Sequence, residues 1–262
     1  MIINWDFVKQ KTLWSYEDLI KKLWQTLRYD FVQTHYNHTM EEASDYVNEV
    51  QAGYLQHRGD RAWLDGLITN FAWLKRAGVQ NYLDLVQQVD SREKCETFLQ
   101  ESGMGFPELI ETLNYLLRWV LPFPTPIREF FNPDDPAQMR YFQALKQQQI
   151  LSNLDLLEKG RTAAQRAQLA DATSIPLAFL LLLIHQADLA RLAYVRGKTV
   201  RHLCGAGYDT LDKLANADLA EMTAAMHAYF GAQGKQFTDY KAVIQLAALI
   251  GGAQRLPRVV EL

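Results

Sequence analysis

Apolar residues recur every three or four positions along nearly the whole chain. Leu19, Leu23 and Leu27 share one helical face, and Leu67 and Phe71 share another. This spacing is the period of an amphipathic α-helix, whereas runs of alternating β-branched residues and Asn-Gly hairpin turns are absent from the sequence. The pattern therefore predicts an all-α protein.

Capping patterns predict where several helices begin. A hydroxyl residue precedes an acid or amide by three positions in three pairs: Ser15 with Asp18, Thr39 with Glu42, and Thr162 with Gln165. Such a pair satisfies backbone N–H groups at a helix start. Thr125 followed by Pro126 predicts a further N-cap, with proline at the first helical position.

A short pattern recurs at the ends of three predicted helices. It consists of an apolar residue, two spacers, a small residue and then Gly78, Gly103 or Gly207. Glycine in this place takes the left-handed conformation that ends a helix, and the next apolar residue folds back. Chance is the alternative, since any all-α chain ends some helices at glycine. The sequence predicts helical hairpins with structural turns at Gly78, Gly103, Gly160 and Gly207.

Prolines mark the clearest boundary in the chain. Pro122, Pro124 and Pro126 alternate with other residues, and this forbids a continuous helix. All six tryptophans precede the boundary and are interpreted mainly as core residues, of which an exposed subset would anchor a partner. The sequence predicts an aromatic-rich helical lobe over residues 1–121, a partly helical connector over 122–150 and a second helical lobe over 151–262.

The composition is that of an ordinary globular protein. Of the 262 residues, 48% are apolar and 22% are charged, and the net charge is −3. A chain so close to neutral is not a bulk polycation, so any contact with nucleic acid must come from a local patch. The two distant cysteines, Cys95 and Cys204, exclude a disulfide framework and a metal site made of cysteines alone.

The sequence gives no sign of a membrane segment. No basic stretch followed by an apolar core opens the chain, so a secretory signal is not expected. The longest apolar run, residues 177–184, has eight residues, whereas a membrane-spanning helix needs roughly 20. We interpret this run as a buried helix turn and expect a cytoplasmic protein with no membrane association.

Part of the second lobe resembles a known prokaryotic family. The residues that carry the resemblance are 157–160, 162–170, 174–176, 180–184, 186–192 and 202–215. Together they are similar to the helix-hairpin-helix-like core of domain-of-unknown-function family 4332. The resemblance covers about residues 157–216 and implies a helix-hairpin-helix-like fold there. A diverged second copy around residues 74–112 is a weaker suggestion.

The hairpin departs from the family pattern at one point. In the family, an Asp-Leu-x-Arg stretch, here ending at Arg191, leads into a Gly-apolar-Gly turn. Tyr194 and Arg196 stand where the family has its two glycines, and Gly197 follows one place later. Such glycines let backbone N–H groups approach a phosphate at a helix N-terminus. The resemblance therefore supports the fold, while the missing glycines weaken the usual inference of DNA binding.

Basic and aromatic residues gather around this hairpin and form the main candidate site. The basic cluster extends to Lys213, and it could contact phosphates or form an ordinary solvated face. The candidate residues for binding a nucleic acid or another partner are Arg191, Tyr194, Arg196, Lys198 and Arg201.

No arrangement of residues predicts catalysis. His35, His38 and Glu42 could face a metal on one continuous helix, but the capping pattern places His38 outside that helix and engages Glu42. His202 and Cys204 are two residues apart on a predicted helix, so they point to different faces. The sequence has no nucleophile elbow and no phosphate-binding glycine loop. We expect no catalytic residues, no metal and no cofactor.

These observations favour a non-enzymatic binding or scaffold protein. It would engage a macromolecular partner, most often a protein, through the surfaces of helical hairpins. The alternative is weak, sequence-independent association with DNA or RNA through the basic cluster between Arg191 and Lys213.

Overall fold

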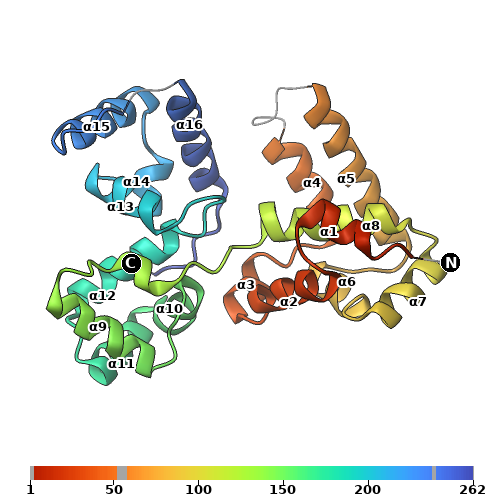
Figure 1. Cartoon of the computed structure of the whole chain (residues 1–262), viewed down its shortest axis with the longest axis horizontal. Helices are drawn as coiled ribbons and strands as arrows, with labels where there is room; N and C mark the ends of the chain where they lie inside the picture. The colour runs from red at the N-terminus through yellow and green to blue at the C-terminus, as the bar shows by residue number, and fades with distance from the viewer. Residues whose placement is uncertain (1–2, 52–57, 238–239, 262) are drawn as a thin grey trace. The chain divides into compact units, whose positions relative to one another are not determined.

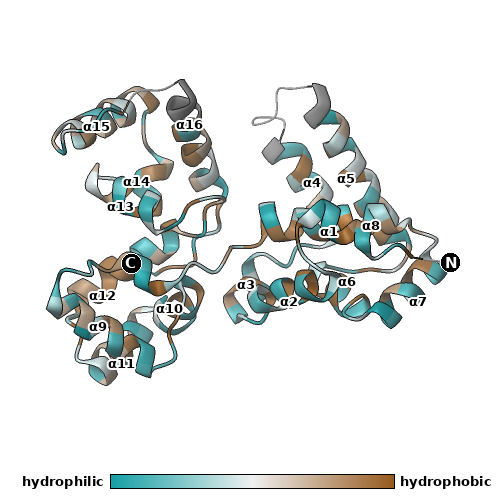
Figure 2. Cartoon of the chain, in the orientation of Figure 1, coloured by the Kyte–Doolittle hydropathy of each residue, from teal (hydrophilic) through white to brown (hydrophobic). Residues whose placement is uncertain are grey.

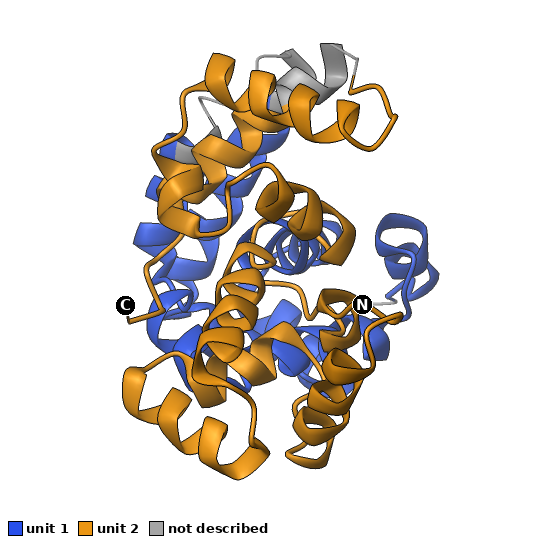
Figure 3. Cartoon of the chain, turned by 90° about the vertical axis from the view of Figure 1, so that its left-hand side faces the viewer, with its two compact units in different colours: residues 1–121 blue, residues 122–262 orange. Residues whose placement is uncertain are grey.

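Helices make up the secondary structure of both parts of the chain (Figure 1). The computed structural model describes residues 3–51, 58–237 and 240–261. The chain divides into two compact units, residues 1–121 and residues 122–262, which are coloured separately in Figure 3. No strand occurs among the described residues, which confirms the all-α prediction. None of the helices in these residues combines the length and apolarity needed to span a bilayer.

Unit 1 is built around the amphipathic helices that the sequence predicts. Its elements are α1 (Asp6–Thr12), α2 (Tyr16–Leu27), α3 (Asp30–His35), α4 (Met40–Gln51), α5 (Arg58–Arg76), α6 (Tyr82–Gln88), α7 (Arg92–Ser102), α8 (Phe106–Tyr115) and the π-helical turn η1 (Leu116–Val120). Leu19, Leu23 and Leu27 of α2 are fully buried, as are Leu67 and Phe71 of α5. α4 and α5 form a helical hairpin, and α1 packs against α8.

Unit 2 contains a short 3₁₀ turn and eight helices in its described residues. They are η2 (Ile127–Phe130), α9 (Pro136–Gln147), α10 (Asn153–Gly160), α11 (Ala163–Thr173), α12 (Leu177–Leu189), α13 (Gly197–Gly205), α14 (Leu211–Ala215), α15 (Leu219–Gly231) and α16 (Tyr240–Arg255). α12 is among the most apolar of them (Figure 2). α10, α11 and α12 pack on one another, and α16 packs on both α14 and α15.

The segment expected to be a separate connector is part of unit 2. Residues 122–150 include η2 and α9, and both pack on later helices of that unit: η2 on α12 and α13, and α9 on α11. The tryptophans also depart from the expectation of a core role. Trp73 and Trp119 are exposed, and the other four are half-buried. Such large rings are rarely covered completely, even where most of their surface is packed.

Most of the predicted caps are present. The Ser15 hydroxyl accepts the Asp18 N–H at 3.1 Å. The pairs at Thr39 and Thr162 form in the same way. In each of them the N–H of the threonine also donates to the side chain three residues later. The prediction at Thr125 is wrong, because its backbone is used elsewhere. Its N–H donates to the Asn153 side chain at 2.7 Å, and η2 begins after Pro126 with no side-chain cap.

Three of the four predicted glycine turns have the expected geometry. Gly78, Gly103 and Gly207 have φ values of 88°, 66° and 96°, in the left-handed region. Gly160 is different, since it is the last residue of α10 and has no positive φ. A Cβ at this position would lie 2.7 Å from Cδ1 of Ile184 on α12, so the glycine allows close helix packing instead of a turn.

Two segments of the chain share one plan at a constant spacing of 71 residues. We call residues 78–121 repeat A and residues 149–192 repeat B. Their helices begin at corresponding positions: α6, α7 and α8 at 82, 92 and 106, and α10, α11 and α12 at 153, 163 and 177. The correspondence includes most of the segment 74–112 that the sequence singled out and continues to residue 121.

The turns of the two repeats also coincide. Gly78 and Gly103 in repeat A correspond to Gln149 and Ser174 in repeat B, and all four residues have positive φ. Repeat B thus places side-chain-bearing residues in a conformation that glycine adopts freely. The backbone path is therefore the same although the residue types differ.

Corresponding hydrogen bonds hold the start of each repeat. The Gln80 N–H donates to the Asp84 carboxylate at 2.8 Å, and the Leu151 N–H donates to the Asp155 carboxylate at 3.1 Å. An isolated antiparallel bridge then joins the cap of the first helix to an earlier segment. The bridge pairs Asn81 with Thr39 in unit 1, and Ser152 with Pro126 in unit 2.

A third, shorter hairpin follows in unit 2. Gly207 precedes the capping residue Thr210 by three positions, as Gly78 precedes Asn81. α14 and α15 pack on α16 as α10 and α11 pack on α12. The helical hairpin is therefore the building unit on both sides of the proline boundary.

Candidate partner-binding surface

The hairpin turn between α12 and α13 carries the residue with the most unusual backbone. Tyr194 has φ of 63° and is 61% exposed. The next residue, Val195, is buried and anchors the turn, and Arg196 occupies the N-cap position of α13. Tyr194 thus adopts a left-handed conformation at the position where the resemblance leads us to expect a glycine, and it is largely exposed to solvent.

Arg191 does not belong to this surface, which corrects the sequence prediction. Its side chain is fully buried and forms an ion pair with Asp188, with Nε 2.8 Å and Nη2 2.5 Å from Oδ1. Nη2 also donates to the Pro257 carbonyl at 3.0 Å. Because two partners inside unit 2 use its guanidinium, Arg191 fastens the end of α12 to the C-terminal segment and cannot contact a ligand.

Two other cations of the predicted cluster also have partners inside unit 2. The Arg196 guanidinium lies over the Phe123 ring, 4.4 Å from its centroid, and donates to the Val195 carbonyl at 2.6 Å. Burial lowers the pKa of Arg196, and the nearby Glu129 carboxylate opposes this shift. Arg201 donates to the Glu129 carbonyl but remains exposed. Lys198 is exposed as well, whereas the exposed Lys213 pairs with Asp209 at 2.6 Å. The open cationic surface therefore consists of Lys198 and Arg201.

Glu129 occupies the N-terminus of α13. Its Oε2 accepts the Gly197 N–H at 3.0 Å, and a Cβ on Gly197 would lie 2.3 Å from the Glu129 Cβ. The glycine therefore admits an internal carboxylate where a helix-hairpin-helix would admit a phosphate. Sequence reasoning missed Glu129 because it lies 68 positions earlier, on η2, in a segment interpreted as a connector.

The other candidates for chemistry do not form reactive pairs. The Glu42 carboxylate accepts the N–H and hydroxyl of Thr39 and is committed to capping α4. The His202 ring packs against Phe230, with centroids 4.7 Å apart. Burial raises the pKa of the Cys204 thiol to about 11, with Asp209 adding to the shift, which disfavours the thiolate at neutral pH.

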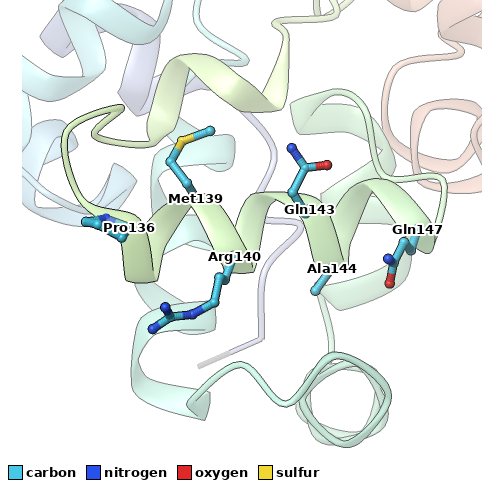
Figure 4. A pocket seen from close by; sticks show the side chains of 6 residues that line it. All are labelled: Pro136, Met139, Arg140, Gln143, Ala144 and Gln147. Atoms are coloured by element: carbon cyan, nitrogen blue, oxygen red, sulfur yellow. The ribbon is translucent and has the colours of Figure 1, made fainter.

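A shallow hollow follows one side of α9 (Figure 4). It is lined by residues of that helix alone: Pro136, Met139, Arg140, Gln143, Ala144 and Gln147. In the close view, Met139 and Gln143 project to one side of the helix, and Arg140 and Ala144 project to the other. The lining contains one cation and two amides but no acid–base pair, so the hollow does not suggest a catalytic centre.

The apolar run at the start of α12 is not buried throughout, contrary to the sequence interpretation. Leu177 is 53% exposed and Leu182 is 39% exposed, while Leu180, Leu183 and Ile184 are buried. The run covers two faces of one helix. Its buried residues lie on the face that packs on α10 and α11, and its exposed residues lie on the face toward solvent. A continuous apolar run conceals this division, since no polar residue marks the outer face.

Comparison with known proteins identifies the region that contains these surfaces. Residues 137–256 match the model of a family described as "Domain of unknown function (DUF4332)". The match includes α10 to α16 and the hairpin turn at Tyr194, and it starts within α9. No curated protein and no solved structure matches the chain.

Proposed function

Taking residues 137–256 as a member of the DUF4332 family, we propose that they form a non-enzymatic binding module for a protein partner. The hairpin turn at Tyr194 is its contact point, and Lys198 on the first turn of α13 flanks it. The rest of unit 2 holds this turn in place through the Arg191 ion pair and the Glu129 cap.

The observation that carries the proposal is the combination of strain and exposure at Tyr194. A side chain in the left-handed region costs roughly 1–2 kcal/mol relative to the usual conformation, and glycine avoids this cost. The residue is nevertheless 61% exposed. A left-handed backbone at an exposed side chain points to a role for that side chain. An exposed tyrosine on a rigid turn is a typical anchor of protein interfaces.

The surroundings of the turn favour protein over nucleic acid. A carboxylate already caps α13, and the three arginines of the cluster, Arg191, Arg196 and Arg201, all have partners within the unit. The alternative function, weak contact with DNA or RNA, depends on Lys198 and Arg201, and two exposed cations neutralise few phosphates.

The test is affinity capture by the full chain from an extract of its source cells, with and without nuclease. Tyr194→Gly relaxes the backbone and removes the ring, so we expect it to fold at least as well and to lose the captured protein. Leu13→Gly is the matched control, because Leu13 is also exposed and left-handed (φ 72°) but lies in unit 1. Capture that survives in Tyr194→Gly, or that disappears with nuclease, would contradict the proposal.

A further inference from the structure

The two repeats allow one helix to be compared directly with its counterpart. α8 of repeat A corresponds to α12 of repeat B at the spacing of 71 residues. Many of the buried positions agree along both helices, for example Leu109 with Leu180 and Leu113 with Ile184. The inner faces of α8 and α12 therefore pack in the same way, and any difference lies on their outer faces.

In unit 1, the chain itself covers one outer stripe of α8. α1 lies against α8 (Figure 1). The Trp5 and Phe7 rings contact Phe106 at centroid distances of 5.2 Å and 6.3 Å. Val8 of α1 is fully buried. Phe106 is buried, and Ile110, one turn later on the same stripe, is fully buried too.

In unit 2, the equivalent stripe has no such cover among the described residues. Leu177, the counterpart of Phe106, is 53% exposed, and Leu181, the counterpart of Ile110, is half-exposed. Both remain leucine although solvent reaches them. Leu177 and Leu181 are four residues apart, so they form one continuous apolar stripe on α12.

We propose that the stripe of Leu177 and Leu181 is a docking site for a short amphipathic helix of a partner protein. The occupant carries a bulky aromatic residue and an aliphatic residue three positions apart, like Trp5, the N-cap residue of α1, and Val8 within α1. The choice rests on the equivalent stripe in unit 1, where the residues packed on Phe106 are those of a helix with this pattern. The α1 of a second copy is not available, since it is already packed on its own α8.

The experiment uses the full chain and a labelled peptide of residues 3–13. Isolated helices of this length are marginal in water, so Gln10→Lys is joined to Asp6 by a lactam, at two positions that face solvent on α1. We expect saturable binding by fluorescence anisotropy. The same peptide with Trp5→Ala should not bind, and this control leaves the protein unchanged.

Protein variants locate the site. Leu177→Glu removes apolar contact at an exposed position, and we expect it to weaken peptide binding by at least about tenfold. Leu182→Glu is the matched control, because its counterpart Glu111 is exposed in unit 1, outside the cover of α1. We expect Leu182→Glu to change the affinity by less than about twofold, since its position is not part of the stripe. Thermal melts of both variants check folding.

Three outcomes would overturn the inference. They are the absence of saturable binding, equal weakening by Leu177→Glu and Leu182→Glu, and a dimer of the chain that Leu177→Glu dissociates while the peptide fails to bind. The stripe is separate from the hairpin turn, so Tyr194→Gly should leave peptide binding intact. Failure of this inference is thereby distinguished from failure of the proposed function.

Discussion

Repeat A and repeat B follow the same backbone plan but fill it with different chemistry. In η1, which follows α8, the buried positions Leu117 and Val120 are apolar. Their counterparts at the end of α12 are Asp188 and Arg191, a buried ion pair. The comparison shows that the two repeats share their turns, caps and helix starts. The residue types that fill equivalent buried positions differ between them.

The difference has a consequence for stability. An ion pair inside a protein contributes little compared with apolar residues of similar size, yet removing one partner leaves an uncompensated charge. The pair in repeat B also holds Pro257 through the Arg191 guanidinium. Repeat A has no equivalent contact to hold, since η1 is followed directly by the proline-rich boundary.

The largest predicted effect comes from breaking this pair. Arg191→Val should destabilise the chain by about 3–5 kcal/mol, because it leaves the Asp188 carboxylate buried without a partner. The double variant Asp188→Leu/Arg191→Val installs the residue types of repeat A and should recover most of the loss. Urea unfolding of the wild type, Arg191→Val, Asp188→Leu and the double variant measures both effects. If the double variant loses as much free energy of unfolding as the two single variants together, the apolar pair of repeat A cannot replace the ion pair of repeat B.

The second prediction concerns the left-handed positions. Gly103→Ser installs the residue that repeat B has at Ser174 and should cost about 1 kcal/mol, since a side chain in this region is strained. Gly207→Ala should cost about the same. No atom lies within 4 Å of a Cβ at either glycine, so the loss measures the backbone alone. Unchanged melting midpoints would show that the surrounding structure absorbs the strain.

Local patterns in the sequence predicted the parts of the fold that depend on neighbouring residues. The caps at Ser15, Thr39 and Thr162 and the turns at Gly78 and Gly207 need only residues within a few positions. The repeat was harder to find, because its backbone plan tolerates different residues at the turns. The clearest identity within its first helix is a Leu-Asp-Leu stretch around Asp84, matched around Asp155.

The candidate site depends on contacts between distant residues, so the sequence predicted it less well. Arg191 was interpreted as a surface cation because neither Asp188 beside it nor Pro257 later in the chain marks it as buried. Glu129 reaches Gly197 from a segment that sequence reasoning treated as a connector. The exposure of Leu177 was hidden within a uniform apolar run. In each case, tertiary packing decides the role of the residue.

The third prediction compares His38 in unit 1 with its counterpart Thr125 in unit 2. Each gives its carbonyl to the bridge, as acceptor from the Tyr82 and Asn153 N–H groups. Burial lowers the pKa of His38, and Glu42 opposes the shift. Below about pH 6.5, the unfolded chain therefore binds a proton that the folded chain resists, and stability falls as the pH drops.

His38→Thr should reduce this loss, by less than about 1 kcal/mol between pH 7.5 and pH 5.5. It should not remove the loss, because burial also lowers the pKa of His185 and His202. Thermal melts at the two pH values test the prediction. An identical pH dependence in the wild type and in His38→Thr would show that His38 titrates as it does in the unfolded chain.

The smallest expected effect is on the affinity for nucleic acid. Here the turn at Tyr194 is compared with a helix-hairpin-helix whose second helix has a free N-terminus. Glu129 fills the N-terminus of α13, and the exposed cations are Lys198 and Arg201. We expect duplex DNA to bind with a dissociation constant no tighter than about 10⁻⁵ M at physiological salt, which is the range of non-specific contacts, and to dissociate as salt rises.

Glu129→Gln removes the internal carboxylate charge and should strengthen DNA binding slightly, whereas Lys198→Glu should abolish it. A titration by fluorescence anisotropy at two salt concentrations measures these changes. Sub-micromolar binding that resists salt would mean that a phosphate displaces the Glu129 carboxylate from the N-terminus of α13. Nucleic acid would then become the leading partner.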